Sequence, residues 1–125
     1  MGEYNYVGLY ILENGVPVLC MDSAKWGKWM SESKDRFIHK SHIEGDIYLS
    51  TVFLGIDHGF GSDEPVLFET SILRPVQIKE TKGLEDMQTW RSCTLGEAKH
   101  THFAVSAKIR EAMKEGRWPC KVKID

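Results

Sequence analysis

The chain has 125 residues, of which 42% are hydrophobic and 27% are charged. This length predicts a single domain, residues 1–125, and the ordinary composition excludes wholesale disorder. The net charge is -2 and the basic residues are scattered, which excludes an electrostatic footprint for duplex nucleic acid.

No apolar run is long enough to span a membrane, and the N-terminus lacks a signal-peptide pattern, so we expect no membrane partner and a cytoplasmic location. Cys20, Cys93 and Cys120 are odd in number and form no CxxC motif. This usage disfavours a zinc ribbon or a disulfide framework and predicts reduced thiols. Nothing in the sequence indicates a cofactor.

The N-terminal third predicts a hairpin followed by a short helix. Residues 4–12 alternate in polarity like a strand, and Asn14-Gly15 is typical of a tight turn into a return strand over residues 16–19. Pro17 places that return strand at an edge, because proline cannot donate a ladder hydrogen bond. Asp22 or Ser23 then caps a helix that runs to about Ser33.

The middle of the chain predicts several further strands. They cover residues 37–43, 46–55, 66–73 and 87–93, with a turn at Glu44-Gly45 and a loop over residues 57–64. Residues 75–86 predict a ragged strand plus a loop, because Pro75 and Gly83 interrupt them among mixed charges.

The C-terminal third predicts one long helix. Thr94 and Glu97 form a capping box, and Gly116 provides a stop. Apolar residues recur at helical spacing at Leu95, Ala98, His102, Val105, Ile109 and Ala112. The predicted fold is therefore α+β, a mostly antiparallel sheet packed against one long C-terminal helix and one short helix.

Strand register sorts the sheet residues by face, if Glu44-Gly45 is a tight turn and the next loop is centred near Phe60. One face then carries the apolar residues Phe37, Tyr48, Val52, Leu54, Val66, Phe68 and Ile72, against which the long helix should pack. The other face gathers Arg36, Lys40, His42, Thr51, Phe53 and Glu69. Such a mixed face suits a ligand or a partner subunit, and the alternative is a solvated face on which Arg36 or Lys40 pairs with Glu69.

The segment from Leu49 to Gly61 contains the end of a predicted strand and a glycine-flanked loop, and Asp57 and His58 lie in that loop. One interpretation makes His58 a general base or a metal ligand that Asp57 orients. Glu69, His42 or His102 would then supply the remaining metal ligands, although no metal-binding spacing is present. The alternative is that Asp57 caps the turn and His58 is an exposed loop residue.

Two further residues allow a structural and a functional interpretation. Phe60 could stack on a base or plug a neighbouring subunit. His102 lies in the apolar stripe of the long helix, where a histidine is more often a satisfied core residue than a ligand.

One motif in the middle of the chain resembles a known family. It is Ser50-Thr-Val-Phe-Leu-Gly-Ile-Asp-His-Gly-Phe-Gly61, followed by Pro65 and Leu67-Phe-Glu-Thr70. It resembles a family of small uncharacterised phage and prophage proteins that share an STVFLGxDHxFG…P…LFET pattern. A tryptophan-bearing segment before Asp35-Arg36 and a Thr-x-x-Glu-Ala helix start at Thr94 fit the same family. The resemblance implies a viral origin and a location in the host cytoplasm, with no established activity.

We therefore expect a phage accessory protein that binds a small ligand, such as a nucleotide-type signal of host defence, within a homodimer or higher homo-oligomer. Arg36, Lys40 and Arg91 are the basic groups that could meet phosphates. The expected ligand-binding residues are Arg36, Lys40, Thr51, Phe53, Asp57, His58, Phe60, Glu69, Arg91 and His102. The alternatives are a small hydrolase that uses Asp57, His58 and Glu69, and a structural or regulatory interaction protein without a small ligand.

Overall fold

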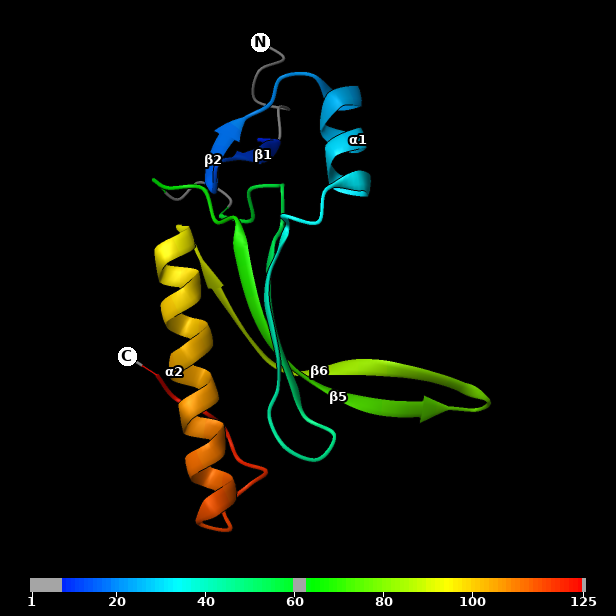
Figure 1. Cartoon of the computed structure of the whole chain (residues 1–125), viewed down its shortest axis with the longest axis vertical. Coiled ribbons are helices and arrows are strands. Elements are labelled where there is room, and N and C mark those ends of the chain that lie inside the picture. The colour runs from blue at the N-terminus through cyan, green and yellow to red at the C-terminus, as the bar shows by residue number, and fades with distance from the viewer. Residues whose placement is uncertain (1–7, 60–62, 125) are drawn as a thin grey trace.

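The structure is a computed structural model, and it describes residues 8–59 and 63–124. Its elements are β1 (Tyr10–Glu13), β2 (Val16–Leu19), α1 (Ser23–Glu32), β3 (Phe37–His42), β4 (Tyr48–Phe53), β5 (Phe68–Ile78), β6 (Thr81–Ser92) and α2 (Leu95–Lys114). β1 and β2 pair with each other, and the other four strands form an antiparallel sheet in the order β3-β4-β5-β6 (Figure 1). The predicted α+β class is therefore confirmed, with one short helix and one long C-terminal helix.

The β1-β2 hairpin and α1 gather at one end of the larger sheet (Figure 1). Asn14 and Gly15 take φ angles of 52° and 80°, which the predicted tight turn requires, and the start of the strand predicted over residues 4–12 lies outside the described residues. Asp22 caps α1, because its side chain accepts hydrogen bonds from the amides of Ala24 and Lys25.

Gly55 allows α1 to pack closely against the end of β4. Its φ angle is 76°, and a Cβ at this position would lie 2.6 Å from the sulfur of Met30. The indole Nε1 of Trp26 donates a hydrogen bond of 3.0 Å to the Gly55 carbonyl. The glycine of the central motif is therefore explained by positive φ and by close packing under the helix.

α2 covers one face of the four-stranded sheet. Its N-terminus has the predicted capping box, in which Thr94 accepts from the Glu97 amide while Glu97 accepts from the Thr94 amide. The predicted stripe is buried at Ala98, His102, Val105, Ile109 and Ala112. Val105 and Ile109 pack with Leu49 and Ile72 in one core cluster, and Ala98 packs with Phe53 and Phe68 in another. Gly116 follows the helix with a φ angle of 73°.

The strand registers overturn the predicted sorting of β4. Thr51 pairs with Thr70 and Val52 pairs with Glu69, while His42 pairs with Tyr48 across the preceding turn. The pairing of β4 with β5, and with β3 from His39 to His42, differs by one residue from the pairing that was assumed. A shift of one residue exchanges the two faces of a strand. A register irregularity between Phe37 and His39 then restores the assumed pairing of Phe37 with Val52.

Several residues therefore lie on the opposite face of the sheet from the one predicted. Thr51 and Phe53 are buried beneath the helices, whereas Tyr48, Val52 and Phe37 lie on the face that was predicted to be polar. Phe68 and Ile72 are buried on the helix side, as expected.

β5 and β6 continue past the end of β4 as a two-stranded arm. The last pair between β4 and β5 is Tyr48 with Leu73, but β5 and β6 stay paired as far as Ile78 and Thr81. Figure 1 shows the arm projecting away from α2. The prediction of a ragged strand and loop over residues 75–86 was wrong, because Pro75 is tolerated where β5 has no neighbour on its outer side.

Candidate functional site

The covered face of the sheet contains a buried polar network centred on His102. Its Nδ1 atom lies 2.9 Å from Thr51 Oγ1, and its Nε2 atom lies 2.8 Å from Ser41 Oγ. Thr51 Oγ1 in turn lies 2.7 Å from Thr70 Oγ1. Each ring nitrogen therefore has a hydroxyl partner, which is what a buried histidine needs.

Burial favours the neutral form of His102. Burial lowers the pKa of His102 to about 4, and the neighbouring His39 acts in the same direction. The ring centroids of the two histidines are 4.6 Å apart. The interpretation of His102 as a satisfied core residue fits this geometry, because a neutral imidazole held by two hydroxyls stabilises the helix-sheet contact.

Phe53 also belongs to the covered interior. It is 1% exposed and its ring lies 5.7 Å from Trp29 of α1 in an edge-to-face arrangement. The placement of Thr51 and Phe53 on one face with Glu69 is therefore wrong. The cause is the register shift of β4, which sends these two side chains to the helix side and Glu69 to the other.

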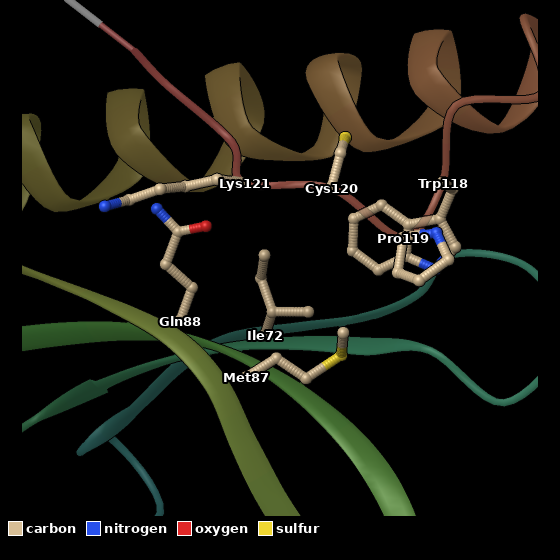
Figure 2. Close-up of a pocket in the computed structure, with 7 residues that line it drawn as sticks. All are labelled: Ile72, Met87, Gln88, Trp118, Pro119, Cys120 and Lys121. Atoms are coloured by element: carbon tan, nitrogen blue, oxygen red, sulfur yellow. The ribbon is translucent and has the colours of Figure 1, made fainter.

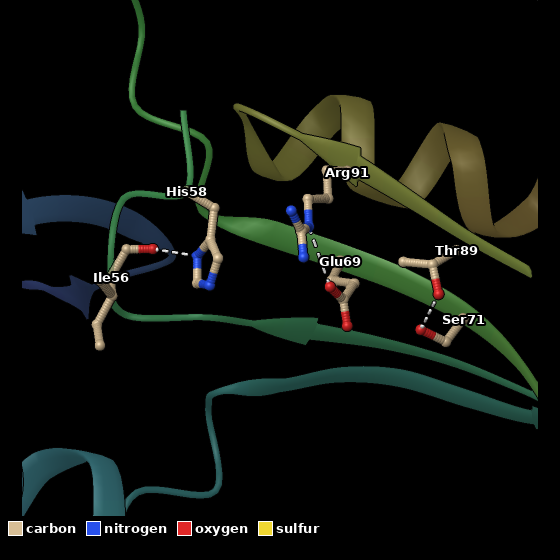
Figure 3. Close-up of polar contacts among 6 residues, drawn as sticks. All are labelled: Ile56, His58, Glu69, Ser71, Thr89 and Arg91. Carbon is tan, nitrogen blue, oxygen red and sulfur yellow. Dashed lines mark hydrogen bonds and ion pairs between the residues drawn. The ribbon is translucent and has the colours of Figure 1, made fainter. Parts of the chain in front are cut away.

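The Asp57-His58 loop is held together by its own hydrogen bonds. Asp57 Oδ1 accepts from the amides of Gly59 at 2.7 Å and Val66 at 2.9 Å. His58 Nδ1 donates to the Ile56 carbonyl at 2.8 Å (Figure 3). The carboxylate thus caps the turn, and the orientation of the His58 ring comes from a backbone carbonyl rather than from Asp57.

The open face of the sheet is the surface opposite α2, and no described helix or strand covers it (Figure 1). Cross-strand pairing places Lys40, Ser50, Ser71 and Thr89 in one row. The neighbouring row consists of Phe37, Val52, Glu69 and Arg91. We call these two rows the open face.

Polar pairs connect β5 and β6 across the open face. Arg91 Nε lies 3.1 Å from Glu69 Oε2, and Ser71 Oγ lies 3.2 Å from Thr89 Oγ1 (Figure 3). The Arg91 and Glu69 side chains are 48% and 22% exposed, so the ion pair is accessible to solvent. The expected pairing of Glu69 with Arg36 or Lys40 is replaced by the pairing with Arg91, which stands directly opposite on β6.

Cations stack on aromatic rings at the β3 side of the open face. The Cζ atom of Arg36 lies 4.1 Å from the centroid of Phe37, whose side chain is 56% exposed. Lys40 Nζ lies 5.3 Å from the Tyr48 ring, and the His42 ring lies 4.9 Å from the same ring. Among the buried side-chain nitrogen and oxygen atoms of the described residues, Arg36 Nε has no hydrogen-bond partner. This edge therefore combines aromatic surface with positive charge.

The predicted metal ligands do not converge. Glu69 belongs to the open face and His42 lies beside it, whereas His102 is buried under α2. In residues 8–59 and 63–124, no group of three His, Cys, Asp or Glu side chains could hold a metal ion. Phe60, which was expected to act at the loop tip, lies outside the described residues.

Cys93 is a poor candidate for a nucleophile. Burial raises the pKa of its thiol, and the carboxylates of Glu64, Glu97 and Asp57 raise it further. A thiol in such surroundings stays protonated at neutral pH, and the thiolate is the reactive form.

A separate hollow of about 370 Å³ lies between the sheet and the C-terminal tail (Figure 2). Its walls include Ile72, Met87 and Trp118. The Gln88 amide fixes the tail beside it, since it donates to the Val122 carbonyl at 2.7 Å and accepts from the Val122 amide at 2.9 Å. These bonds show that the tail is docked on β6, which the sequence did not predict.

Sequence reasoning missed the row of hydroxyls on the open face. Ser50, Ser71 and Thr89 lie one after another on β4, β5 and β6. Their strand positions were visible in the sequence, but only the correct register aligns them.

No family model, curated protein or solved structure matches this chain. No helix within the described residues is both long and apolar enough to cross a membrane. Function therefore has to be argued from the geometry of the chain itself.

Proposed function

We propose that this protein binds a small anionic ligand that carries an aromatic ring, such as a nucleotide, on its open face. One observation carries the proposal. The sheet face opposite α2 is uncovered, and on it a row of hydroxyls runs from Lys40 on β3 to Thr89 on β6, with Arg91 in the neighbouring row.

The dimensions of the open face suit a small molecule rather than a single ion. Lys40 and Arg91 are on the two outer strands, three inter-strand steps apart. At the usual strand spacing this corresponds to about 14 Å across the strands, and Arg91 lies one row further along them than Lys40. A ligand of that length can place negative charge near both cations and its middle over Ser50 and Ser71, whose hydroxyls donate and accept hydrogen bonds.

The aromatic residues of this region can bind the ring of the ligand. Phe37 is exposed and Tyr48 lies beside Lys40, so a planar ring can stack next to a cation. Stacking of a base on an aromatic side chain contributes about 1–3 kcal/mol in single-stranded nucleic-acid complexes. A ligand with both a ring and phosphates would use both features at once.

The geometry favours binding over hydrolysis. The Asp57 carboxylate accepts hydrogen bonds from two backbone amides and the Ile56 carbonyl accepts one from His58 Nδ1, so both side chains serve to shape the loop. Glu69 is paired with Arg91. Combined with the phage-family resemblance, the proposal extends to an accessory protein that holds a nucleotide-type defence signal in the host cytoplasm.

Isothermal titration calorimetry with a panel of linear and cyclic nucleotides tests the proposal. We expect at least one nucleotide to bind, and the double variant Lys40→Gln/Arg91→Gln to weaken it at least tenfold. Hydrogen bonds to charged groups contribute about 1.5–3 kcal/mol each, which converts to that loss or more.

The matched control removes two exposed lysines from α2, in the variant Lys108→Gln/Lys114→Gln. It carries the same change in net charge on a different surface. Equal weakening by both double variants would show that only long-range charge matters, and no binding of any nucleotide would refute the ligand class.

A further inference from the structure

β3 is an edge strand with backbone groups available for pairing. It pairs with β4 on one side only, and no described segment pairs with its outer side. The Ile43 amide donates to the Ile47 carbonyl, so the alternation of an antiparallel ladder directs the backbone of Ser41 and His39 toward β4. The backbone groups of Lys40 and His42 therefore point outward.

A pocket of about 240 Å³ lies beside this edge, between β3 and α2. It is lined by Ile38, His39, Thr51, Lys99, His102 and Phe103. Phe103 is 58% exposed, and its ring centroid is 5.2 Å from that of His39. The pocket has room for one apolar side chain, and the exposed Phe103 ring, which packs against the rings of His39 and His102, forms one wall.

Basic side chains predominate along the edge. Residues 36–43 include Arg36 and Lys40 and no acidic residue, and Lys99 adds a further cation from α2. A second copy of β3 paired antiparallel at this edge would bring like charges opposite one another, which is unfavourable. An acidic segment would meet complementary charge.

We infer that β3 and α2 form a groove that binds an extended acidic peptide as an added strand, with one apolar side chain in the pocket beside Phe103. Backbone hydrogen bonds to the outward groups of β3 would supply affinity, and the pocket and the cations would supply specificity. This groove lies at the edge of the sheet beside α2, and it shares the β3-side cations Arg36 and Lys40 with the open face proposed for the small ligand.

Selection from a library of random linear peptides tests the inference. Peptides enriched on the wild-type protein should alternate acidic with bulky apolar residues. Phe103→Asp and Lys99→Glu should each weaken the best enriched peptide at least tenfold. The matched controls Ala107→Asp and Lys108→Glu place the same charges on exposed positions of α2 and should change its affinity less than threefold.

Amide hydrogen exchange provides the readout of strand addition. The amides of Lys40 and His42 should exchange fast in the free protein and become protected by the peptide, whereas those of His39 and Ser41 should be protected in both states.

Three outcomes would overturn the inference. They are enrichment of basic peptides or of none, equal weakening by the α2 control variants, and protection of Lys40 and His42 in a concentration-dependent dimer without peptide. The nucleotide titration does not involve Phe103 or Lys99, so failure of one proposal is distinguishable from failure of the other.

Discussion

The two faces of the four-stranded sheet differ in what their side chains do, although they alternate along the same strands. On the covered face, Phe53 and Leu49 pack under the helices and Thr51 satisfies His102. On the open face, Ser50 stands beside Lys40 and Val52 stands between Phe37 and Glu69, with no described element above them. Our proposal therefore assigns stability to the covered face and binding to the open face, and substitutions of adjacent residues can test this assignment.

The largest difference is expected from a pair of substitutions at the end of β4. Phe53→Ala should lower the free energy of unfolding by about 3–5 kcal/mol, because it leaves a cavity among Trp29, Phe68 and the β1-β2 hairpin. Val52→Ala, one residue away on the open face, should lower it by less than about 1.5 kcal/mol. Urea denaturation measures both, and equal losses would contradict the assignment of faces.

The next effect is a dependence of stability on pH that belongs to the covered face. The pKa of His102 is lowered from 6.5 to about 4 in the folded state, so the unfolded chain binds the proton more tightly. Stability is therefore complete above pH 6.5 and is lost as the pH falls toward 4. The shift corresponds to about 3 kcal/mol.

His102→Gln isolates this effect, because glutamine does not titrate. Urea denaturation of both proteins between pH 7 and pH 4 should show the wild-type curve falling more steeply. Parallel curves would mean that His102 titrates normally and that the buried network does not hold it neutral.

Features set by local sequence were predicted from the sequence. Asn14-Gly15 forms its tight turn, Thr94 and Glu97 form the capping box, and the apolar stripe of α2 is buried, because each depends on residues within a few positions of one another. The buried position of His102 follows from the same stripe.

Features set by pairing between segments were not predicted. The turn at Glu44-Gly45 and the loop after β4 each set a register, and one residue in either exchanges every side chain between faces. The polar network is a second example. The sequence placed Thr51 on the polar face of the sheet and His102 in the core. Only tertiary packing brings these two residues into hydrogen-bond distance of Ser41 and Thr70.

A smaller effect is expected at the Asp57 loop, which belongs to neither face. Asp57→Ala removes the acceptor for the Gly59 and Val66 amides and should lower the free energy of unfolding by about 1–2 kcal/mol. Asp57→Asn keeps an acceptor oxygen and should recover most of the loss. Nucleotide affinity should stay within threefold in both variants. A tenfold loss would show that the loop is part of the binding site.

The smallest stability effect is expected on the open face itself. The Glu69-Arg91 pair is accessible to solvent, so Arg91→Gln should change the free energy of unfolding by less than about 1 kcal/mol. Ligand affinity should fall nonetheless. A stability loss above 2 kcal/mol, measured in urea, would make Arg91 a structural residue and weaken the contrast between the faces.

The most direct test of the central claim is a map of backbone amide chemical shifts in ¹H–¹⁵N spectra, recorded while a nucleotide from the panel is added. The account predicts that the largest changes fall on the strand residues of the open face, such as Lys40, Ser50, Ser71 and Arg91. The buried stripe of α2 should change little. Changes concentrated on α2 or on the 370 Å³ hollow beside Trp118, with the open face unaffected, would contradict the account.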